Sequence, residues 1–318
     1  MPKFRAKYEF MSASFQKLLV GFLFSLLSFW SYSQTIRITP KDSLRMVSLP
    51  EMRMTHSYQQ SKTSLPQSVD NSVHPYWRNI FWQAGCSCGQ ASSEGYVYTY
   101  EINRKRDLDA TLDANRYAYS FTYNFLNIGN TVCGASFIES HDIIREAGIP
   151  NLPTNNGVMT DGPMKKWLTG YDKYYQSMHN RINNVYAIHA GTSEGLDVLK
   201  HWLYDHLEGS PYGGMAFFYA NHVYEPAVIP EGYPEAGKHI ITGFSNTSHA
   251  MSIVGYNDEV QYDYNGDGVC TNHLDITNDG VVDMRDWEIG AFKIANSFNG
   301  SNTPLIWADQ GFCYVMYR

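Results

Sequence analysis

The stretch Trp82-Gln-Ala-Gly-Cys-Ser-Cys-Gly-Gln-Ala91 places a cysteine, Cys88, at the start of a helical pattern. Small and apolar residues then recur at the spacing of one helix face: Ala91, Gly95, Tyr98 and Ile102. A thiol is a good nucleophile only as a thiolate, and the unpaired backbone N–H groups at a helix N-terminus stabilise that anion. The sequence therefore predicts that Cys88 is a nucleophile that opens a helix.

The residues around Cys88 suit an attack on a carbonyl group. Gly85 and Gly89 allow a substrate carbonyl to approach the backbone closely. The side-chain amide of Gln83 can donate a hydrogen bond to the oxyanion that forms, alongside the backbone N–H of Cys88. Cys86 is the alternative nucleophile in this stretch.

Two later segments carry the groups that such a thiol needs. In Ser248-His-Ala-Met-Ser-Ile-Val-Gly-Tyr256, His249 opens an apolar strand, which is a rigid position for a general base. In Phe292-Lys-Ile-Ala-Asn-Ser-Phe298, Asn296 follows a strand, and its side-chain oxygen can orient an imidazole. The alternative is that His249 is a structural histidine, one of 11 in the chain, and that Asn296 is a turn residue.

The secondary-structure pattern changes halfway along the chain. Helices are expected from Cys88 onward, from Ser136 to Gly148, and from Ser193 to Gly209. Ser136 and Glu139 form a capping-box pattern at the start of the second of these. Strands are expected at residues 215–219, 250–254, 291–295 and 312–317. A helix-rich half followed by a strand-rich half predicts an α+β fold of two lobes with a cleft between them.

The order of these segments and their flanking residues resemble the papain family of cysteine peptidases. The shared features are Gln before a Cys at a helix start, His-Ala before a strand that ends near Gly-Tyr, and Asn-Ser before an aromatic residue. The tail Trp307-Ala-Asp-Gln-Gly-Phe312 resembles the closing turn and final strand of the family. The resemblance covers residues 76–318 and implies a papain-like two-lobe fold. A helical lobe would carry the nucleophile helix, and a β-barrel-like lobe would carry the His and the Asn.

The resemblance also implies a role for individual residues. They are the oxyanion-hole donor Gln83, the nucleophile Cys88, its ion-pair partner His249 and the orienting residue Asn296. Three features depart from the family pattern: the spacing from Gln83 to Cys88 is one residue shorter, Gly89 replaces an aromatic residue, and Phe298 replaces a tryptophan. These departures concern the shape of the subsites and the geometry of the oxyanion hole.

The five cysteines are an odd number, which leaves at least one unpaired thiol in an exported chain. In the papain family an upstream cysteine pairs with one that precedes a glycine-rich turn. The resemblance therefore implies a disulfide between Cys86 and Cys133, which is followed by Gly-Ala-Ser.

The activity implied by the resemblance is peptide-bond hydrolysis by an endopeptidase, through a thioester that Cys88 forms and water hydrolyses. It implies a peptide or protein substrate, a monomer, and no cofactor for catalysis. Two other functions are compatible with the same residues. One is a noncatalytic papain-like binding module, which Gly89 and the short spacing from Gln83 to Cys88 favour. The other is an acyltransferase or amidase with the same triad.

The N-terminus has the pattern of a secretory signal peptide. Basic residues precede an apolar run at 18–30, and small residues follow at 31 and 33. We therefore expect a signal peptide at 1–33, and a secreted, periplasmic or cell-surface protein without membrane attachment after cleavage. A membrane anchor is the alternative, but this run is shorter than the roughly 20 residues that a spanning helix needs.

The rest of the sequence predicts a leader followed by one domain. Residues 34–75 are polar and aperiodic, and we interpret them as a leader or short prosegment before a peptidase domain at 76–318. The net charge of -7 and the pI near 5.9 argue against nucleic acid or an anionic membrane surface as a partner.

An acidic insertion at about residues 261–288 separates the His strand from the Asn strand. Its oxygen-bearing side chains occupy alternate positions before a glycine, as in EF-hand-type and dockerin-like calcium loops. The expected ligands are Asp263, Asn265 and Asp267 in the first loop, and Asp275, Thr277, Asp279, Asp283, Asp286 and the carbonyl of Val281 in the second. The first loop is incomplete, because Leu274 occupies its last ligand position. We expect one or two structural calcium ions; the alternative is a metal-free acidic loop.

Overall fold

The computed structural model describes residues 38–127, 134–155, 167–221, 226–244, 248–297 and 307–318. The chain divides into two compact units, Met1–Ser33 and Gln34–Arg318, and every described residue belongs to the second unit. The predicted signal peptide and the first four residues of the predicted leader lie outside the described ranges. None of the described helices is both long enough and apolar enough to cross a bilayer.

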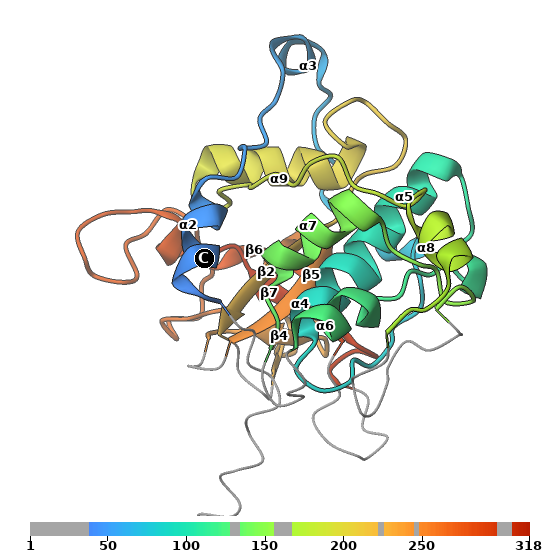
Figure 1. The fold of residues 1–318 in the computed structure, drawn as a ribbon. Helices are drawn as coiled ribbons and strands as arrows, with labels where there is room; N and C mark the ends of the chain where they lie inside the picture. The colour runs from blue at the N-terminus through green and yellow to red at the C-terminus, as the bar shows by residue number, and fades with distance from the viewer. Residues whose placement is uncertain (1–37, 128–133, 156–166, 222–225, 245–247, 298–306) are drawn as a thin grey trace, which may run out of the picture. The chain divides into compact units, whose positions relative to one another are not determined.

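Within the described residues, a seven-stranded sheet is formed mainly by the second half of the chain (Figure 1). Its hydrogen-bonded order is β1-β5-β6-β7-β4-β3, and β2 also pairs with β5. The strands are β1 Ser68–Asp70, β2 Ala216–Asn221, β3 Ala227–Val228, β4 His239–Ile241, β5 Ser248–Gln261, β6 Ile289–Ala295 and β7 Phe312–Met316. The strands β4 and β7 are parallel, and the other pairs are antiparallel. The four predicted strands are therefore confirmed as β2, β5, β6 and β7.

The predicted nucleophile helix is confirmed and extends from Cys88 to Arg106. It consists of three consecutive parts: α4 Cys88–Gln90, the π-helical segment η3 Ala91–Tyr98, and α5 Thr99–Arg106. Gly95 lies in the middle of η3, where a Cβ atom would be 2.5 Å from a ring carbon of Phe81. Glycine thus allows the segment that leads into the helix to pack directly on it.

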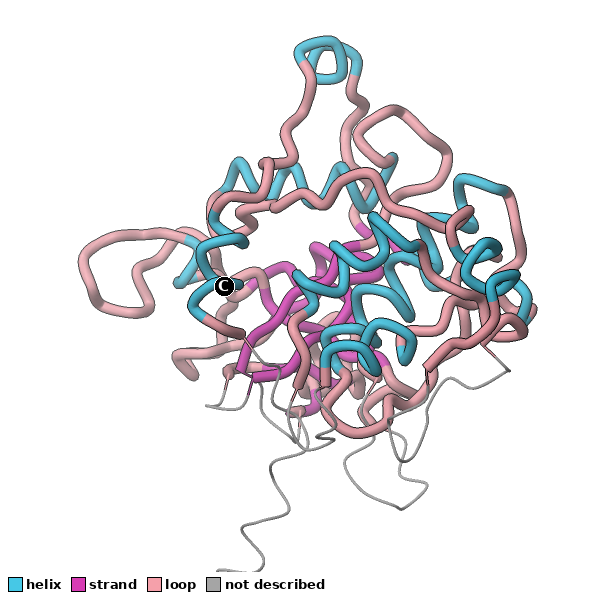
Figure 2. The backbone as a smooth tube through the Cα atoms, viewed as in Figure 1, coloured by secondary structure: helices cyan, strands magenta, loops and turns pink. Residues whose placement is uncertain are grey.

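The other described helices lie mostly above and to the right of the strands in the view of Figure 2. They are α2 Pro40–Val47, α3 His56–Ser61, α6 Ser120–Leu126, α7 Phe137–Ala147, α8 Tyr171–Ser177 and α9 Ser193–Asp205, with short 3-10 turns η2 Asn71–Val73, η4 Asp113–Asn115 and η5 Met284–Asp286. The predicted start of α7 is confirmed, because Ser136 Oγ accepts the backbone N–H of Glu139 at 3.1 Å. The predicted end of α9 at Gly209 is wrong. The helix ends at Asp205, since His206 and Leu207 adopt positive φ angles of 61° and 56°.

The predicted leader contains secondary structure that its aperiodic sequence does not indicate. Thr39 caps α2, and its hydroxyl oxygen accepts the backbone N–H of Asp42 at 3.2 Å. The helix α3 is attached to α9, because the hydroxyl of Tyr58 donates to Asp205 Oδ1 at 2.6 Å. The strand β1 pairs with β5 in the sheet. This N-terminal segment is therefore attached to the rest of the unit through Tyr58 and through β1.

Two groups of buried side chains correspond to the two lobes. In the sheet lobe, α9 packs on the strands through Leu196, Leu199, Leu203, Ile253, Phe292 and Val315. In the helical lobe, the buried residues include Tyr98, Ile102, Phe121 and Ile144, which come from η3, α5, α6 and α7 respectively. Figure 1 shows these helices grouped beside the strands. The predicted α+β class with two lobes is confirmed.

Candidate active site

His249 and Asn296 come from neighbouring strands of the sheet. His249 is the second residue of β5, and Asn296 directly follows β6, which pairs with β5. The backbone of Asn296 is held on both sides. Its N–H donates to the Gly311 carbonyl at 2.9 Å, and its carbonyl accepts the Tyr96 hydroxyl at 3.1 Å. Strand pairing and these two bonds therefore fix the position from which the side chain of Asn296 extends.

A short hydrogen bond joins the two side chains. The imidazole Nε2 of His249 lies 2.7 Å from Oδ1 of Asn296, and both residues are buried. The carboxamide oxygen can only accept a hydrogen bond, so this contact assigns the proton of the neutral ring to Nε2. The atom Nδ1 of His249 is then the basic nitrogen.

The nucleophile helix lies against the start of β5, where Cys88 contacts the residue that follows His249. The thiol of Cys88 is hydrogen-bonded by the backbone N–H of Ala250, the residue after His249. The hydroxyl of Ser92, one turn further along the helix, donates to the Ala250 carbonyl at 2.9 Å. The structure thus places the predicted nucleophile and the predicted base on adjoining elements.

Burial raises the pKa of the Cys88 thiol to about 11, and hydrogen bonds from the backbone N–H groups of Ala250 and Gly89 oppose this rise only in part. The side chain is fully buried, so water does not stabilise the thiolate. A positive charge beside the sulfur is therefore required for ionisation at neutral pH. Protonated His249 can supply that charge.

Gln83 lies next to the residue that follows Asn296. Its backbone N–H donates to the Ser297 carbonyl at 2.6 Å, and its Oε1 accepts the Ser297 hydroxyl at 2.8 Å. One hydrogen of its Nε2 goes to the Gly85 carbonyl at 2.9 Å. The amide has a second N–H, which can donate to an oxyanion. Gln83 therefore contacts the residue that follows Asn296, as Cys88 contacts the residue that follows His249.

Cys88 belongs to a buried apolar group. Phe137, Ile138 and Ala250 pack with it, and the partly buried Phe217 packs against them. We call these five residues the Cys88 cluster. The rings of Phe137 and Phe217 are edge to face, with centroids 5.4 Å apart. The cluster therefore presents aromatic and aliphatic surface beside the thiol.

Side chains of the N-terminal segment also pack against the Cys88 cluster. This apolar surface comes from Ile38 just before α2, Met46 in its last turn, and Leu49 two residues after its end. Lys41 and Glu139 form an exposed ion pair at 3.5 Å between α2 and α7. The Cys88 cluster is thus covered partly by a segment that was predicted to be a leader.

The buried carboxylate of Asp42 attaches α2 to the folded unit. Its Oδ1 accepts the Ser136 hydroxyl at 2.7 Å, and its Oδ2 accepts the backbone N–H and the hydroxyl of Thr39 at 2.9 Å and 2.7 Å. Burial alone would raise the pKa of Asp42, but these hydrogen bonds lower it below its ordinary value. This contact was not predicted from the sequence. The Thr39-Pro-Lys-Asp42 spacing is a capping-box signal that could have identified the helix.

Some of the predicted features fall outside the described residues. Cys133, the expected disulfide partner of Cys86, is one of them, and Phe298 is another. Cys270 and Cys313 have free thiols.

The acidic insertion contains two turns with the predicted spacing. The backbone N–H of Gly268 donates to Asp263 Oδ2, and that of Gly280 donates to Asp275 Oδ2, both at 2.8 Å. The two glycines have φ angles of 84° and 86°, which other residues rarely adopt. These aspartates and glycines occupy the first and sixth positions of the predicted loops, where a calcium loop turns sharply.

An arginine pairs with carboxylates of the second loop. The guanidinium of Arg285 lies 2.6 Å from both Asp279 and Asp283. Both oxygens of Asp286 accept backbone N–H groups, from Thr277 at 2.9 Å and from Asp283 at 3.0 Å. In the part of the chain that the structure describes, no group of three His, Cys, Asp or Glu side chains is arranged to hold a metal ion. A cation bound by Asp279 and Asp283 would compete with the guanidinium of Arg285.

The fold is similar to that of solved cysteine proteases. Xylellain, a cysteine protease from Xylella fastidiosa, matches with a TM-score of 0.54 at 15% identity, over 90% of this chain and 89% of that protein. Procathepsin B S9 from Trypanosoma congolense matches with a TM-score of 0.52 at 16% identity, over 90% and 80%. No protein-family model and no curated protein matches the sequence. The described chain therefore has the papain-like two-lobe fold.

Proposed function

We propose that the protein is a cysteine peptidase that hydrolyses peptide bonds with Cys88, His249 and Asn296. The observation that supports this most strongly is the 2.7 Å contact between His249 and Asn296 beside the buried thiol. A carboxamide that holds an imidazole next to a thiol at a helix start is the arrangement that nucleophilic catalysis by sulfur requires. The papain-like fold makes a peptide or protein the expected substrate.

In the proposed reaction, the thiol proton of Cys88 moves to Nδ1 of His249, and the sulfur attacks the carbonyl carbon of the peptide. The resulting oxyanion accepts hydrogen bonds from the backbone N–H of Cys88 and the free N–H of the Gln83 amide. The tetrahedral intermediate collapses when His249 returns the proton to the leaving amine, and a thioester remains. Water, deprotonated by His249, then hydrolyses the thioester and restores the thiol.

We further propose that the protein acts as a monomer outside the cytoplasm after removal of residues 1–33, and that residues 34–75 form a short prosegment. The packing of Ile38, Met46 and Leu49 against the Cys88 cluster supports the second part. A peptide substrate needs access to the same thiol, so this segment and a substrate would exclude each other.

A peptidyl epoxide tests the proposed chemistry directly, because it alkylates an activated thiol. We expect one covalent adduct per chain, mapped to Cys88 by mass spectrometry. Cys88→Ala should abolish the adduct, and His249→Gln should slow its formation by about 10²-fold or more. An equal labelling rate in the wild type and in His249→Gln would instead favour a noncatalytic binding module, with a thiol that His249 does not activate.

We also propose that calcium binds the second loop of the insertion in a structural role. The supporting observation is the preformed turn, in which Asp275 accepts the N–H of Gly280. Asp275, Thr277, Asp279, Asp283, Asp286 and the Val281 carbonyl would hold the ion, which would replace the Arg285 guanidinium as counter-charge. Bound calcium would stiffen the segment before β6, which leads to Asn296.

Calcium should raise the melting temperature of the wild-type protein. A ligand at about 100 times its Kd adds about 2.7 kcal/mol of stability, which corresponds to several degrees for a chain of this size. Asp275→Asn should remove the increase, while Arg285→Gln should enlarge it by deleting the competing cation. Magnesium is the matched control. Equal calcium-induced shifts in the wild type and in Asp275→Asn would contradict this site.

A further inference from the structure

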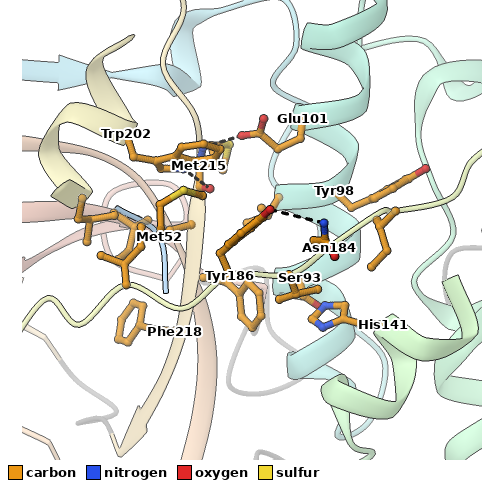
Figure 3. A pocket seen from close by; sticks show the side chains of 18 of the residues that line it. Met52, Ser93, Tyr98, Glu101, His141, Asn184, Tyr186, Trp202, Met215 and Phe218 are labelled. Carbon is orange, nitrogen blue, oxygen red and sulfur yellow. Dashed lines mark hydrogen bonds between the residues drawn. The ribbon is translucent and has the colours of Figure 1, made fainter. Parts of the chain in front are cut away.

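A cavity of about 530 Å³ lies between the nucleophile helix and the sheet (Figure 3). Its walls come from η3, α5, α7, α9 and β2, and from the segment at 182–190. Most of the side chains that line it are apolar; Val97, Ile188, Trp202 and Phe218 are examples. A volume of 300–1,000 Å³ with a largely apolar wall is typical of a small-molecule site.

This cavity is separate from the site of Cys88. Neither Cys88 nor His249 is among the described residues that line it. Phe217 belongs to both regions, since it packs against the Cys88 cluster and also lines the cavity. The ring of His141 contacts Phe217 on the cavity side, with centroids 5.8 Å apart. The cavity and the Cys88 cluster are thus adjacent and share the side chain of Phe217.

Three buried polar side chains that line the cavity each have an atom without a hydrogen-bond partner. These atoms are Oε1 of Glu94, the hydroxyl of Tyr98 and Nδ1 of His141. Each residue is at least 92% buried. More than nine in ten buried polar groups in proteins are hydrogen-bonded, so three unpaired atoms around one cavity are unusual. A ligand that reaches one of them through a small side-chain movement would supply the missing partner.

Two of the lining residues with unpaired atoms carry little charge at neutral pH, and the carboxylate of Glu101, which also lines the cavity, is already paired with Arg104 and His206. Burial raises the pKa of Glu94 to about 8, although hydrogen bonds from Thr122 and Ser140 oppose this. Burial lowers the pKa of His141 to about 4. Both side chains are therefore neutral near pH 7 and would not compensate the charge of an ionic ligand.

One side of the cavity is closed by two chain segments that are held together by few bonds. The backbone N–H of Met52 donates to the Ala187 carbonyl at 2.8 Å, and the N–H of Ala187 donates to the Pro50 carbonyl at 3.0 Å. Tyr186, beside this contact, is 46% exposed to solvent. Figure 3 shows Met52 and Tyr186 over the interior residues Met215 and Ser93. Movement of this edge would open a route from solvent.

We propose that this cavity is a second binding site, for a small uncharged molecule with an apolar body and one hydroxyl or amide group. The apolar wall would bind the body, and the hydroxyl or amide would donate a hydrogen bond to Nδ1 of His141. Binding does not require the thiol of Cys88. The proposed binding site therefore does not depend on the proposed peptidase function.

Titration calorimetry with 1-naphthol, naphthalene and naphthalene-1-sulfonate tests this site in the full-length protein. We expect one equivalent of 1-naphthol to bind to the wild type and equally to Cys88→Ala. The sulfonate should bind about tenfold more weakly or worse, because its charge would be buried without a partner. Absence of saturable 1-naphthol binding, or equal affinity for the sulfonate, would overturn the proposal.

Two variants locate the binding. Ala190→Trp should fill the cavity and weaken 1-naphthol binding by about tenfold or more. His141→Phe keeps a ring but removes Nδ1, so it should weaken 1-naphthol about fivefold and leave naphthalene unchanged, as expected for one lost hydrogen bond. His273→Phe, on the exposed insertion, is the matched control and should bind like the wild type. If Ala190→Trp fails to fold, the affinities of His141→Phe for 1-naphthol and naphthalene test the site without it. An unchanged affinity for 1-naphthol in His141→Phe would contradict this site.

Discussion

Replacing His249 with glutamine is expected to lower kcat/KM for peptide hydrolysis by about 10²–10⁴-fold, the usual contribution of a general base. Glutamine preserves much of the volume of this fully buried side chain, so the fold should survive. It cannot take a proton from Cys88 or return one to the leaving amine. The loss should therefore appear in kcat, measured with a fluorogenic peptide.

The matched control is an exposed histidine. His273→Gln, in the insertion, should leave kcat/KM unchanged. Asn296→Ala should give an intermediate loss, because the ring of His249 remains but loses the acceptor at 2.7 Å that orients it. If His249→Gln retained the activity of His273→Gln, His249 would not be the base, and the proposed reaction would be wrong.

Replacing Asp42 with alanine is expected to raise the activity of the full chain by about tenfold or more. The substitution removes the acceptor for Ser136 and for both donors of Thr39. Hydrogen bonds to charged groups contribute about 1.5–3 kcal/mol each, so detachment of α2 from the Cys88 cluster should become at least tenfold easier. The increase should be seen as a higher initial rate at a fixed peptide concentration.

Lys41→Ala is the control for this experiment, because it removes a neighbouring ion pair on the same helix. The pair is exposed and 3.5 Å long, so its loss should not change the rate. Equal rates for Asp42→Ala and Lys41→Ala would show that docking of α2 does not limit access to the thiol.

The effect of Asp42→Ala on the rate should depend on pH, because folding lowers the pKa of the Asp42 carboxyl. The pKa of the folded carboxyl is lower than its ordinary value of 3.8. The carboxylate therefore stabilises docking at pH values above 3.8 and loses this effect as the pH falls through the lowered pKa. The difference in rate between Asp42→Ala and the wild type should shrink toward pH 3.

The sequence predicted the elements whose patterns are continuous. The helix after Cys88 and the strands that carry His249 and Asn296 have clear periodicity, so their type and order could be read directly. The helices α2 and α3 were missed because each is short and is stabilised by caps and by contacts with distant residues. The contact of Tyr58 with Asp205 is an example that local periodicity cannot reveal.

The residues of the candidate site could be predicted from the sequence, but the side chains that pack around them could not. Cys88 at a helix start and His-Ala before a strand are local signals, and the structure brings their elements together. Packing of Ile38, Met46 and Leu49 on the Cys88 cluster depends on tertiary structure, so residue types alone did not indicate it. Similarly, loop spacing predicted the turns of the insertion, but not the pairing of Arg285 with the aspartates of the second loop.

The charge state of the thiol tests the central claim most directly. Thiolate absorbance near 240 nm can be titrated as the difference between the wild-type protein and Cys88→Ala, without any need for access to the sulfur. If His249 holds Cys88 ionised, the midpoint should lie well below the ordinary cysteine value of about 8.5 and should rise in His249→Gln. A midpoint near 11, the value set by burial and the backbone hydrogen bonds without His249, and identical in both proteins, would contradict the account.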